Sequence, residues 1–404
     1  MDFKFSESLK NMKPSEIREL LKYASKKDFI SFSGGMPNPA TFPFDEIRDI
    51  IDEVMTNYGA LALQYGNTGG LNDLREEIAR MVHETESIKT DYLNVIVTSG
   101  SQQGLYELAK VMVNPGDPII TEEPTYVGAI SAFDSNKAEM HSIRLEDDGM
   151  DIHMAENEIR KLINAGRPPK FIYTIPTFQN PTGISMSLEK RKHLLEVSSR
   201  YSIPIVEDNP YGELRYYGQK LPSLKSMEND NNVIYMGTFS KVMCPGFRLG
   251  YTIGPDEYVN RANLLKQALD LSSSTFSQYV AWLYLKRGVM KTMVPKAIKL
   301  YRGQMDAMLN ALKEGFPDGS KWSRPEGGMF IWATVDSRIN TSALLKDAIE
   351  AGIAYVSGNS FSPSRTQGSS MRLNFTFAGE KLINEGIHRL GGLIGKKLEI
   401  LESA

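Results

Sequence analysis

The stretch at residues 238–250 reads TFSKVMCPGFRLG, and it follows a short apolar segment at 233–237 that is typical of a buried strand. Lys241 therefore comes just after a predicted strand and beside hydroxyl-bearing residues, and Arg248 follows seven positions later. A lysine in this setting can form an imine with a cofactor while its neighbours hold a phosphate. An ordinary turn with surface charges is the alternative, because short motifs also match by chance.

Short segments rich in β-branched residues lie on both sides of this stretch and are bounded by Gly, Pro, Asn or Ser. Such segments are typical of buried strands, and we expect strands at 94–98, 118–121, 171–175, 203–207, 233–237 and 250–253. Between several of them, as at 105–112 and 188–197, most apolar residues are three or four positions apart, which predicts helices. Alternating strands and helices predict an α/β fold with a mostly parallel sheet covered on both faces.

The pattern changes from about residue 277, where long helices are followed by strands near 329–335 and 371–377. This part is predicted to be a smaller α+β domain. Near the start, SGGMPNP at 33–39 disfavours regular structure and is expected to form a loop. We expect an N-terminal segment at 1–43 that packs on the small domain and the active site, a large domain at 44–280 and a small domain at 281–404.

Composition excludes several classes of protein. The chain has 404 residues and a net charge of −3, so no overall positive field is available to bind nucleic acid. Cys244 is the single cysteine, which excludes an intramolecular disulfide and is consistent with a reducing compartment. No two histidines have the i, i+4 spacing of a helical metal site. The N-terminus lacks a secretion signal, and the longest apolar run, 279–285, is too short to span a membrane, so we expect a cytoplasmic protein.

Polar residues follow three further predicted strands. Asp208 lies at the carboxyl end of a strand, where ligands of open α/β sheets bind, and a buried carboxylate there needs a cationic partner. Asn180, in QNPTG at 179–183, offers an amide donor after another strand, although this sequence alone is an ordinary turn. SGSQQ at 99–103 joins a predicted strand to a predicted helix, whose first N–H groups can bind an anion. Ser101 is also a plausible N-cap, and the two roles are compatible.

These motifs, in this order, resemble those of the class I and II aminotransferases, pyridoxal-phosphate enzymes of fold type I, over nearly the whole chain. The segments SGGMPNP at 33–39, LQYG at 63–66 and SGSQQ at 99–103 are similar to the subgroup of 2-aminoadipate/kynurenine and archaeal-type aromatic aminotransferases. The resemblance implies a mostly parallel, seven-stranded type of sheet with helices on both faces, and pyridoxal 5′-phosphate as cofactor.

The resemblance also implies roles for single residues around the cofactor ring. Lys241 would carry the cofactor and shuttle a proton between substrate and cofactor, which requires a neutral amine; burial beside cations lowers a lysine pKa. Asp208 would pair with the pyridinium nitrogen. Asn180 and Tyr211 would donate to the ring's phenolic oxygen, and Tyr126 would stack on the ring, although packing in the core is the alternative for that tyrosine.

Phosphate contacts implied by the resemblance fall on Ser101, Gln102, Thr238, Ser240 and Arg248. Tyr65 would reach the phosphate of the neighbouring subunit, which implies a homodimer with shared active sites. Two positions depart from the family pattern, because Thr238 replaces a common serine and Asn209 replaces a common aspartate. The first keeps its hydroxyl and the second leaves Asp208 in place.

The resemblance places the substrate on Arg372, whose planar fork suits an α-carboxylate, with Gly35 and Asn180 beside it. An exposed charge at the end of a strand is the alternative for Arg372. Arg18 is a candidate for meeting a distal carboxylate, from a segment similar to the mobile region that closes over substrate in this subgroup; a solvated arginine at a helix end is equally compatible.

We therefore expect a ping-pong aminotransferase. It would transfer the amino group of an aromatic or 2-aminoadipate-like L-amino acid, or of glutamate, to a 2-oxo acid such as 2-oxoglutarate. A carbon–sulfur β-lyase or cyclising synthase of the same fold is the nearest alternative, because the same bound substrate can expel a β or γ group. A transcription regulator that uses this fold as a ligand sensor would need a separate DNA-binding module, for which the sequence before the first strands leaves no room.

Overall fold

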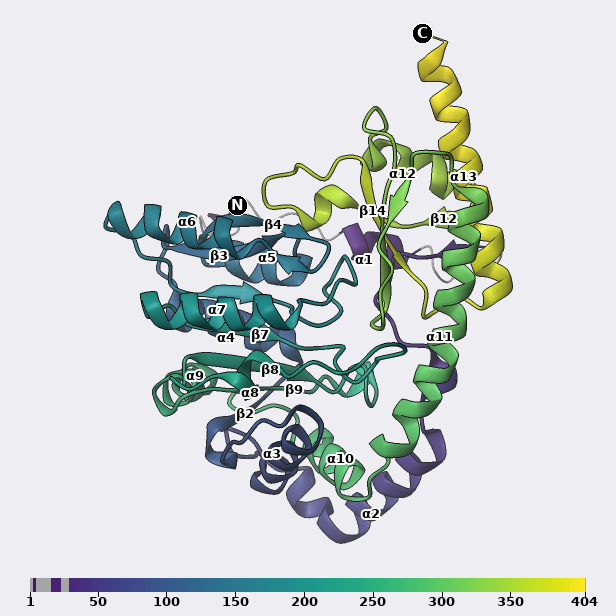
Figure 1. The fold of residues 1–404 in the computed structure, drawn as a ribbon. Helices are drawn as coiled ribbons and strands as arrows, with labels where there is room; N and C mark the ends of the chain where they lie inside the picture. Colours follow the sequence, from purple (N-terminus) through teal and green to yellow (C-terminus); the bar gives the residue numbers. More distant parts are fainter. Residues whose placement is uncertain (1–2, 5–15, 23–28, 404) are drawn as a thin grey trace.

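The computed structural model describes residues 3–4, 16–22 and 29–403. Its centre is an eight-stranded sheet, counted over those residues, with the strand order β2-β9-β8-β7-β6-β3-β4-β5 (Figure 1). The strands span β2 Val95–Thr98, β3 Pro118–Glu123, β4 Glu139–Glu146, β5 Gly149–Met150, β6 Ile172–Thr174, β7 Ile205–Asp208, β8 Val233–Thr238 and β9 Gly250–Ile253.

Most neighbouring strands of this sheet are parallel. The pairs β4–β3, β3–β6, β6–β7 and β7–β8 are parallel, whereas β9 is antiparallel to both β8 and β2, and β5 is antiparallel to β4. The predicted fold class is confirmed. Seven of the strands form the expected type of sheet, and the two-residue β5 adds an eighth strand at its edge.

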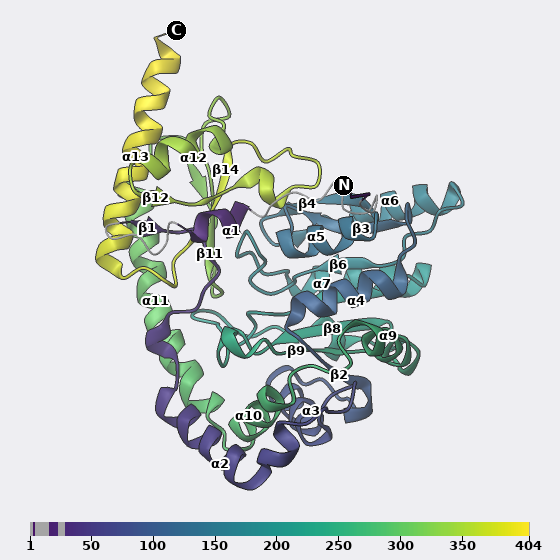
Figure 2. The ribbon, with the colours of Figure 1, turned by 180° about the vertical axis from the view of Figure 1, so that it is seen from behind.

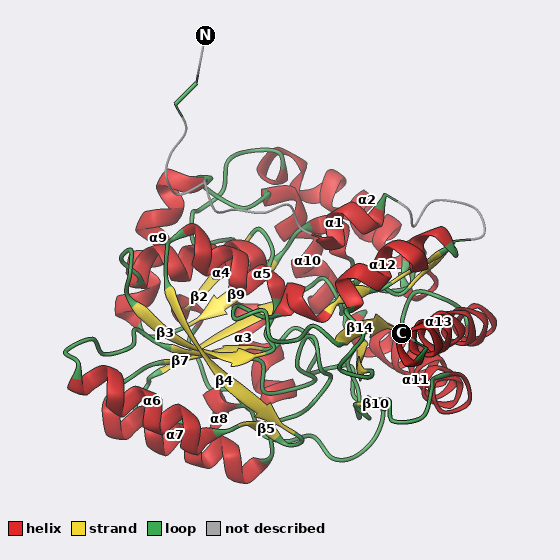
Figure 3. Ribbon diagram, turned by 90° about the horizontal axis from the view of Figure 1, so that it is seen from above, coloured by secondary structure: helices red, strands yellow, loops and turns green. Residues whose placement is uncertain are grey.

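Helices cover both faces of the sheet. On one face lie α4 Ser101–Met112, α5 Val127–Ser135 and α9 Asp256–Leu269, and on the other α6 Ile152–Asn164, α7 Leu188–Tyr201 and α8 Leu224–Met227 (Figure 3). Each face has its own apolar core: Leu105 and Phe133 pack with Val206 on the first, and Ile159 and Leu194 pack with Ile205 on the second. Consecutive residues of β7 thus enter opposite cores, as expected for a strand covered by helices on both faces.

A second, antiparallel sheet lies beside the first. Its strand order is β10-β11-β14-β13, with β10 Lys321–Trp322, β11 Phe330–Thr334, β13 Val356–Ser357 and β14 Ser370–Asn374. The helices α11 Met290–Gly315, α12 Thr341–Glu350 and α13 Glu380–Glu402 pack around it, and the long α11 and α13 run side by side in Figures 1 and 2. Near the N-terminus, β1 Ile30–Ser31 pairs in parallel with β12 Ile353–Ala354.

The helix α11 connects the two parts of the molecule. Its first turns pack with α2 Phe44–Ala62, α3 Asn72–Glu86 and α10 Thr275–Lys286, whereas its later turns belong to the core around the second sheet. The expected boundary between residues 280 and 281 falls inside α10, which packs against α2 and α3 along its length. We therefore propose that the division between large and small domains lies within α11.

No helix in the described ranges is both long enough and apolar enough to cross a membrane.

The short helix α1 Glu16–Leu21 is anchored to the small domain through Glu16, whose carboxylate accepts from the Ser357 N–H at 2.8 Å and from the Ser360 hydroxyl at 2.6 Å. The segment expected to close over substrate runs from about residue 14 to Gly35. Pro14, Ser15 and residues 23–28 of it lie outside the described residues.

Candidate active site

The loops that carry the predicted site residues leave one edge of the large sheet. Because β2, β3, β6, β7 and β8 point the same way, their carboxyl ends share that edge. Asp208 and Thr238 are the last residues of β7 and β8, and the segments after the strands contribute Ser101 and Gln102, Tyr126, Asn180, Tyr211 and Lys241. Arg372 comes from β14 of the second sheet, so the site lies between the two sheets.

Asp208 is a buried carboxylate with one oxygen paired and the other free. The hydroxyl of Tyr173 donates to Oδ2 at 2.8 Å, whereas Oδ1 is buried and has no hydrogen-bond partner. Burial raises the pKa of Asp208 to about 6, against the Tyr173 hydrogen bond, which lowers it. An unpaired buried oxygen is costly, so Oδ1 is poised to accept from a cationic N–H group.

Lys241 lies opposite the N-terminal segment. Its ammonium nitrogen is 2.6 Å from the carbonyl oxygen of Gly35. Burial, together with the nearby cations Arg372 and Arg248, lowers the pKa of Lys241 to about 8. The lowered pKa increases the neutral fraction of this amine near neutral pH relative to a free lysine, and the neutral form is the one that nucleophilic attack or proton abstraction requires.

Arg372 is almost fully buried, with 1% of its surface exposed, which excludes the exposed-charge alternative. Nη1 donates to the Asn180 side-chain oxygen at 2.9 Å and Nη2 to the Ser33 carbonyl at 2.7 Å, while Nε has no partner. The guanidinium also lies over the rings of Phe330 and Phe361, at 4.1 and 4.8 Å from their centroids. Burial lowers the pKa of Arg372 to about 10, so it remains a cation.

Two tyrosines line the space between the acidic and basic groups. Tyr211 accepts a hydrogen bond from the Asn180 amide at 3.2 Å, and the Tyr126 hydroxyl donates weakly to Gln102 at 3.4 Å. The pKa values of both phenols are raised by burial, and both respond to the charges of Asp208 and Arg372. Tyr126 and Tyr211 therefore lie within electrostatic reach of both groups, which places these four residues around one site.

The start of α4 forms a cradle for an anion. Gly100 caps the helix with φ +80°, and a Cβ there would lie 2.6 Å from Arg248 Nη2. A Cβ on Gly250 would lie 2.6 Å from the backbone nitrogen of Ser101. Only glycine fits at these two positions, so the cation and the first N–H groups of α4 come close together. The hydroxyls of Thr238 and Ser240 lie 3.1 Å apart, and Thr238 pairs with Gly250 in the sheet.

Two predicted residues lie away from this cluster within the described chain. Tyr65 has 83% of its surface exposed, and its backbone N–H bonds to the Gln64 side chain. Arg18 is exposed on α1, although its charge still lowers the pKa of Tyr126 slightly against the larger effect of burial. Tyr65 thus faces outward from the subunit, and the Arg18 side chain lies on an exposed part of α1.

Several contacts of the site are not predictable from its motifs. Tyr173 acts on Asp208 from the neighbouring strand, because Tyr173 pairs with Val206 in the sheet register. Ser33 contributes a backbone carbonyl, for which the residue type carries no signal. Phe330 and Phe361 support Arg372 from distant parts of the chain, so only the fold brings them together.

A doubly wound sheet with an amine, a buried carboxylate and an anion cradle at the carboxyl edge defines a class of cofactor-dependent enzyme. Residues 34–390 match the family described as aminotransferase class I and II, and the chain belongs to that family. It is 45% identical over 98% of its length to aromatic-amino-acid aminotransferase 1 of Thermococcus litoralis, covering 95% of that protein.

Two solved structures extend the likeness. A kynurenine aminotransferase of Pyrococcus horikoshii in complex with PMP has a TM-score of 0.94 and 43% identity, with 98% of this chain and 97% of the other covered. An alpha-aminoadipate aminotransferase of Thermus thermophilus, complexed with N-(5′-phosphopyridoxyl)-L-leucine, has a TM-score of 0.90 and 32% identity, with 98% of each chain covered. The protein is therefore an aminotransferase that uses pyridoxal 5′-phosphate.

The residues present fit that cofactor. The unpaired Oδ1 of Asp208 suits a pyridinium N–H, and the cradle of Gly100, Gly250 and Arg248 suits a phosphate. Lys241 supplies a buried amine of lowered pKa, whose nearby cations include Arg248 of that cradle.

Proposed function

We propose that this aminotransferase transfers the amino group of an aromatic or 2-aminoadipate-like L-amino acid, or of glutamate, to a 2-oxo acid such as 2-oxoglutarate, in a ping-pong cycle. The observation that carries the proposal is a set of three buried groups at the site between the two sheets: the Lys241 amine with its lowered pKa, the Asp208 carboxylate with its unpaired Oδ1, and the Arg372 guanidinium. The relatives named for aromatic, kynurenine and aminoadipate substrates support the substrate class.

When bound, the cofactor supplies an electron sink that stabilises negative charge at the substrate Cα. Asp208 keeps the ring nitrogen protonated, with Tyr173 holding its other oxygen in place. Lys241 would hold the cofactor covalently and, once freed, its amine would move a proton between the substrate Cα and the cofactor carbon on the other side of the transferred nitrogen. Its position near the Gly35 carbonyl gives the freed amine a hydrogen-bond acceptor at that edge of the site.

The remaining cofactor contacts divide between ring and phosphate. Tyr126 would stack on the ring, and Asn180 and Tyr211, which are hydrogen-bonded to each other, would donate to its phenolic oxygen. The phosphate binds at the start of α4, and its contacts are Ser101, Gln102, Thr238, Ser240, Arg248 and the partner subunit's Tyr65. The last contact requires a homodimer, and the high exposure of Tyr65 in the single chain supports this assignment.

Substrate binding rests on Arg372. Two of its nitrogens are held by Asn180 and Ser33, which fixes the plane of the fork, and the unpaired Nε remains available to one carboxylate oxygen. Gly35 lies beside this group, where a Cβ would approach the Phe330 ring to 3.2 Å. A close, side-chain-free backbone leaves room for the substrate carboxylate.

We assign part of the selectivity for the substrate side chain to Arg18, which lies on the helix that Glu16 anchors to the small domain. Arg18→Ala should lower kcat/KM for glutamate or 2-aminoadipate more than for phenylalanine or tyrosine, by about 10- to 100-fold, the worth of a hydrogen bond to a charged group. Lys22→Ala removes a cation that follows the same helix and pairs with Glu19, and serves as the control. Equal losses for both substrate classes would remove Arg18 from the specificity argument.

A substrate panel tests the reaction itself. Purified enzyme is incubated with single L-amino acids and 2-oxoglutarate, and the 2-oxo acid, glutamate and ammonia are quantified. The proposal expects one 2-oxo acid and one glutamate for each amino acid consumed, without free ammonia. A β-lyase would instead release ammonia and a β-substituent from cysteine-type substrates. Activity confined to aspartate or alanine would contradict the substrate class and leave the aminotransferase assignment intact.

A further inference from the structure

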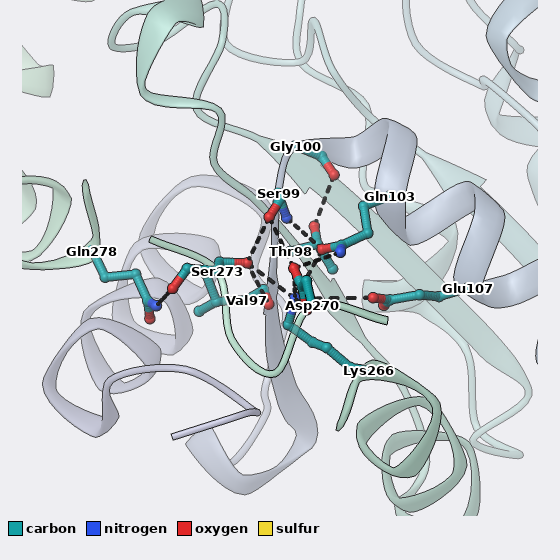
Figure 4. Close-up of polar contacts among 10 residues, drawn as sticks. All are labelled: Val97, Thr98, Ser99, Gly100, Gln103, Glu107, Lys266, Asp270, Ser273 and Gln278. Atoms are coloured by element: carbon teal, nitrogen blue, oxygen red, sulfur yellow. Dashed lines mark hydrogen bonds and ion pairs between the residues drawn. The ribbon is translucent and has the colours of Figure 1, made fainter. Parts of the chain in front are cut away.

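A buried polar network lies directly beneath the turn that precedes α4 (Figure 4). Its centre is Lys266 of α9, which exposes none of its surface. Lys266 Nζ is 2.9 Å from both carboxylate oxygens of Asp270, 2.9 Å from Gln103 Oε1 and 3.1 Å from Ser273 Oγ. The cation therefore has a full set of hydrogen-bond acceptors within the described structure.

Gln103 connects this ion pair to the backbone. Its Oε1 accepts from the backbone N–H of Ser99 at 2.6 Å, and its Nε2 donates to Asp270 Oδ2 at 2.7 Å. Gln103 is the third residue of α4, and its side chain reaches back past the N-cap residue Gly100 to the N–H of Ser99, one position earlier than in a capping box. The Ser99 hydroxyl also donates to Asp270 Oδ2, at 3.2 Å.

These contacts hold the turn from both sides. The Gln103 amide has its oxygen fixed by Lys266 and its nitrogen fixed by Asp270, so its orientation is determined. Ser99 is held through both its backbone and its side chain, and the next residue, Gly100, has φ +80°. The N–H groups of Ser101 and Gln102, which follow, start the helix and have no partner within it.

Stability alone is a weak reason for this arrangement. Burying the Lys266 ammonium costs desolvation that its attraction to the partly exposed Asp270 often fails to offset, whereas an i, i+4 pair of this kind forms readily in solvent on a helix surface. Here both charges converge on one amide that orients one backbone turn. The network is therefore arranged to fix geometry.

We propose that Lys266 and Asp270 are positioning residues for the cofactor phosphate, acting through Gln103 on the Ser99–Ser101 turn. The inference rests on the proposed placement of the phosphate at the start of α4. Neither residue needs to contact the phosphate. Their effect is to keep the N–H groups of Ser101 and Gln102 aimed at one point, so that the anion binds without first ordering the loop.

The test compares cofactors with and without a phosphate. The full-length chain is freed of cofactor, and dissociation constants are measured by absorbance for pyridoxal 5′-phosphate and for pyridoxal. Gln103→Met removes the amide while leaving Lys266 and Asp270 to pair with each other, and Lys266→Met removes the cation. Both should weaken binding of pyridoxal 5′-phosphate by about 10- to 100-fold and change that of pyridoxal less than about twofold. Inorganic phosphate should compete less well in the same proportion.

Two further variants separate positioning from a general loss of structure. Lys266→Arg keeps the charge and should restore most of the affinity for the phosphorylated cofactor. Glu107→Gln alters a buried carboxyl 4.0 Å from Lys266 whose oxygens have no hydrogen-bond partner, so it should leave both dissociation constants unchanged. If Lys266→Met does not fold, Gln103→Met decides the question.

Equal weakening of pyridoxal and its phosphate, or no weakening of either by Gln103→Met, would overturn the proposal. Failure of the proposed function has a different signature. The wild-type chain would then bind the cofactor and transfer no amino group, while the ratio of the two dissociation constants would still decide the role of the network.

Discussion

Arg372 and Asn180 are 192 positions apart in the chain and are joined by a hydrogen bond of 2.9 Å between Nη1 and the amide oxygen. The bond ties β14 of the small sheet to the loop after β6 of the large one. Because the Asn180 amide also donates to Tyr211, the group assigned to the substrate carboxylate and the groups assigned to the cofactor ring share one residue. A shift in the position of either ligand is therefore expected to change the contacts of the other.

Arg372→Lys tests the assigned carboxylate site. A lysine keeps the positive charge but cannot hold Asn180 and Ser33 while presenting a planar fork. We expect kcat/KM for every amino acid to fall by about 100-fold, with cofactor affinity changed little, because removing hydrogen bonds to a charged group costs about 1.5–3 kcal/mol each. A loss of cofactor affinity as large as the loss of kcat/KM would assign Arg372 to the cofactor instead.

Asp208→Asn tests the orientation of the cofactor ring. An amide cannot stabilise the protonated ring nitrogen, so turnover should fall by about 10²–10⁴-fold or more while cofactor binding persists. Tyr173→Phe is the matched control, because it removes only the hydrogen bond to Oδ2 and leaves the carboxylate. It should cost about tenfold at most. Near wild-type turnover by Asp208→Asn would show that the ring nitrogen lies elsewhere.

The lowered pKa of Lys241 predicts a pH-dependent stability of the cofactor-free chain. The pKa is 10.5 in a free lysine and about 8 in the folded chain, so between these values the unfolded chain binds more protons and stability rises with pH. Lys241→Met should therefore raise Tm at pH 7, and the gain should shrink as pH increases from about 8 to 10.5.

Lys190 is the matched control, because its pKa is shifted in the opposite direction to that of Lys241. Burial lowers its pKa, but hydrogen bonds to Asp148 and Glu146 outweigh this and raise it overall. Lys190→Met should lower Tm at neutral pH. A Lys241→Met variant less stable than wild type at pH 7 would mean that this amine is not held in an unfavourable charged state.

The sequence predicts the strands that carry the site residues better than it predicts the rest of the sheet. The strands that end in Asp208 and Thr238 begin with the apolar, β-branched pairs Ile205–Val206 and Val233–Ile234, and this signal comes from the sequence directly. In contrast, β4 was not expected, because Ile143 is its one buried residue and charged side chains interrupt the pattern. A strand near the edge of a sheet buries too little surface to show a clear period.

Buried charges are the second class of feature that the sequence does not reveal. Lys266 and Asp270 have the spacing of a solvated helical pair, and only the packing of α9 against α4 buries Lys266, while the Asp270 side chain stays 26% exposed. Arg372 shows the same difficulty, since its burial depends on two aromatic rings from separate elements. Local pattern reports residue type and period, whereas desolvation is set by tertiary contacts.

A mixed dimer tests whether Tyr65 completes the partner's site. Chains carrying Lys241→Ala and chains carrying Tyr65→Phe are purified, mixed under conditions that exchange subunits, and assayed. In a mixed dimer with shared sites, one site has both wild-type residues and the other has neither. Activity should rise above the average of the two parents. With exchange verified, activity that stays at that average would contradict shared sites.

The most direct measurement follows one half of the reaction on the purified enzyme. The holoenzyme is mixed with an aromatic L-amino acid in the absence of any acceptor, and the cofactor spectrum and the 2-oxo acid are recorded together. One equivalent of 2-oxo acid per site should form as the cofactor changes to its amine form, and adding 2-oxoglutarate should reverse the spectrum. In a parallel sample, borohydride should fix the cofactor on Lys241, and Lys241→Ala should show neither result. Release of ammonia without stoichiometric amino transfer, or cofactor fixed on another lysine, would contradict the account.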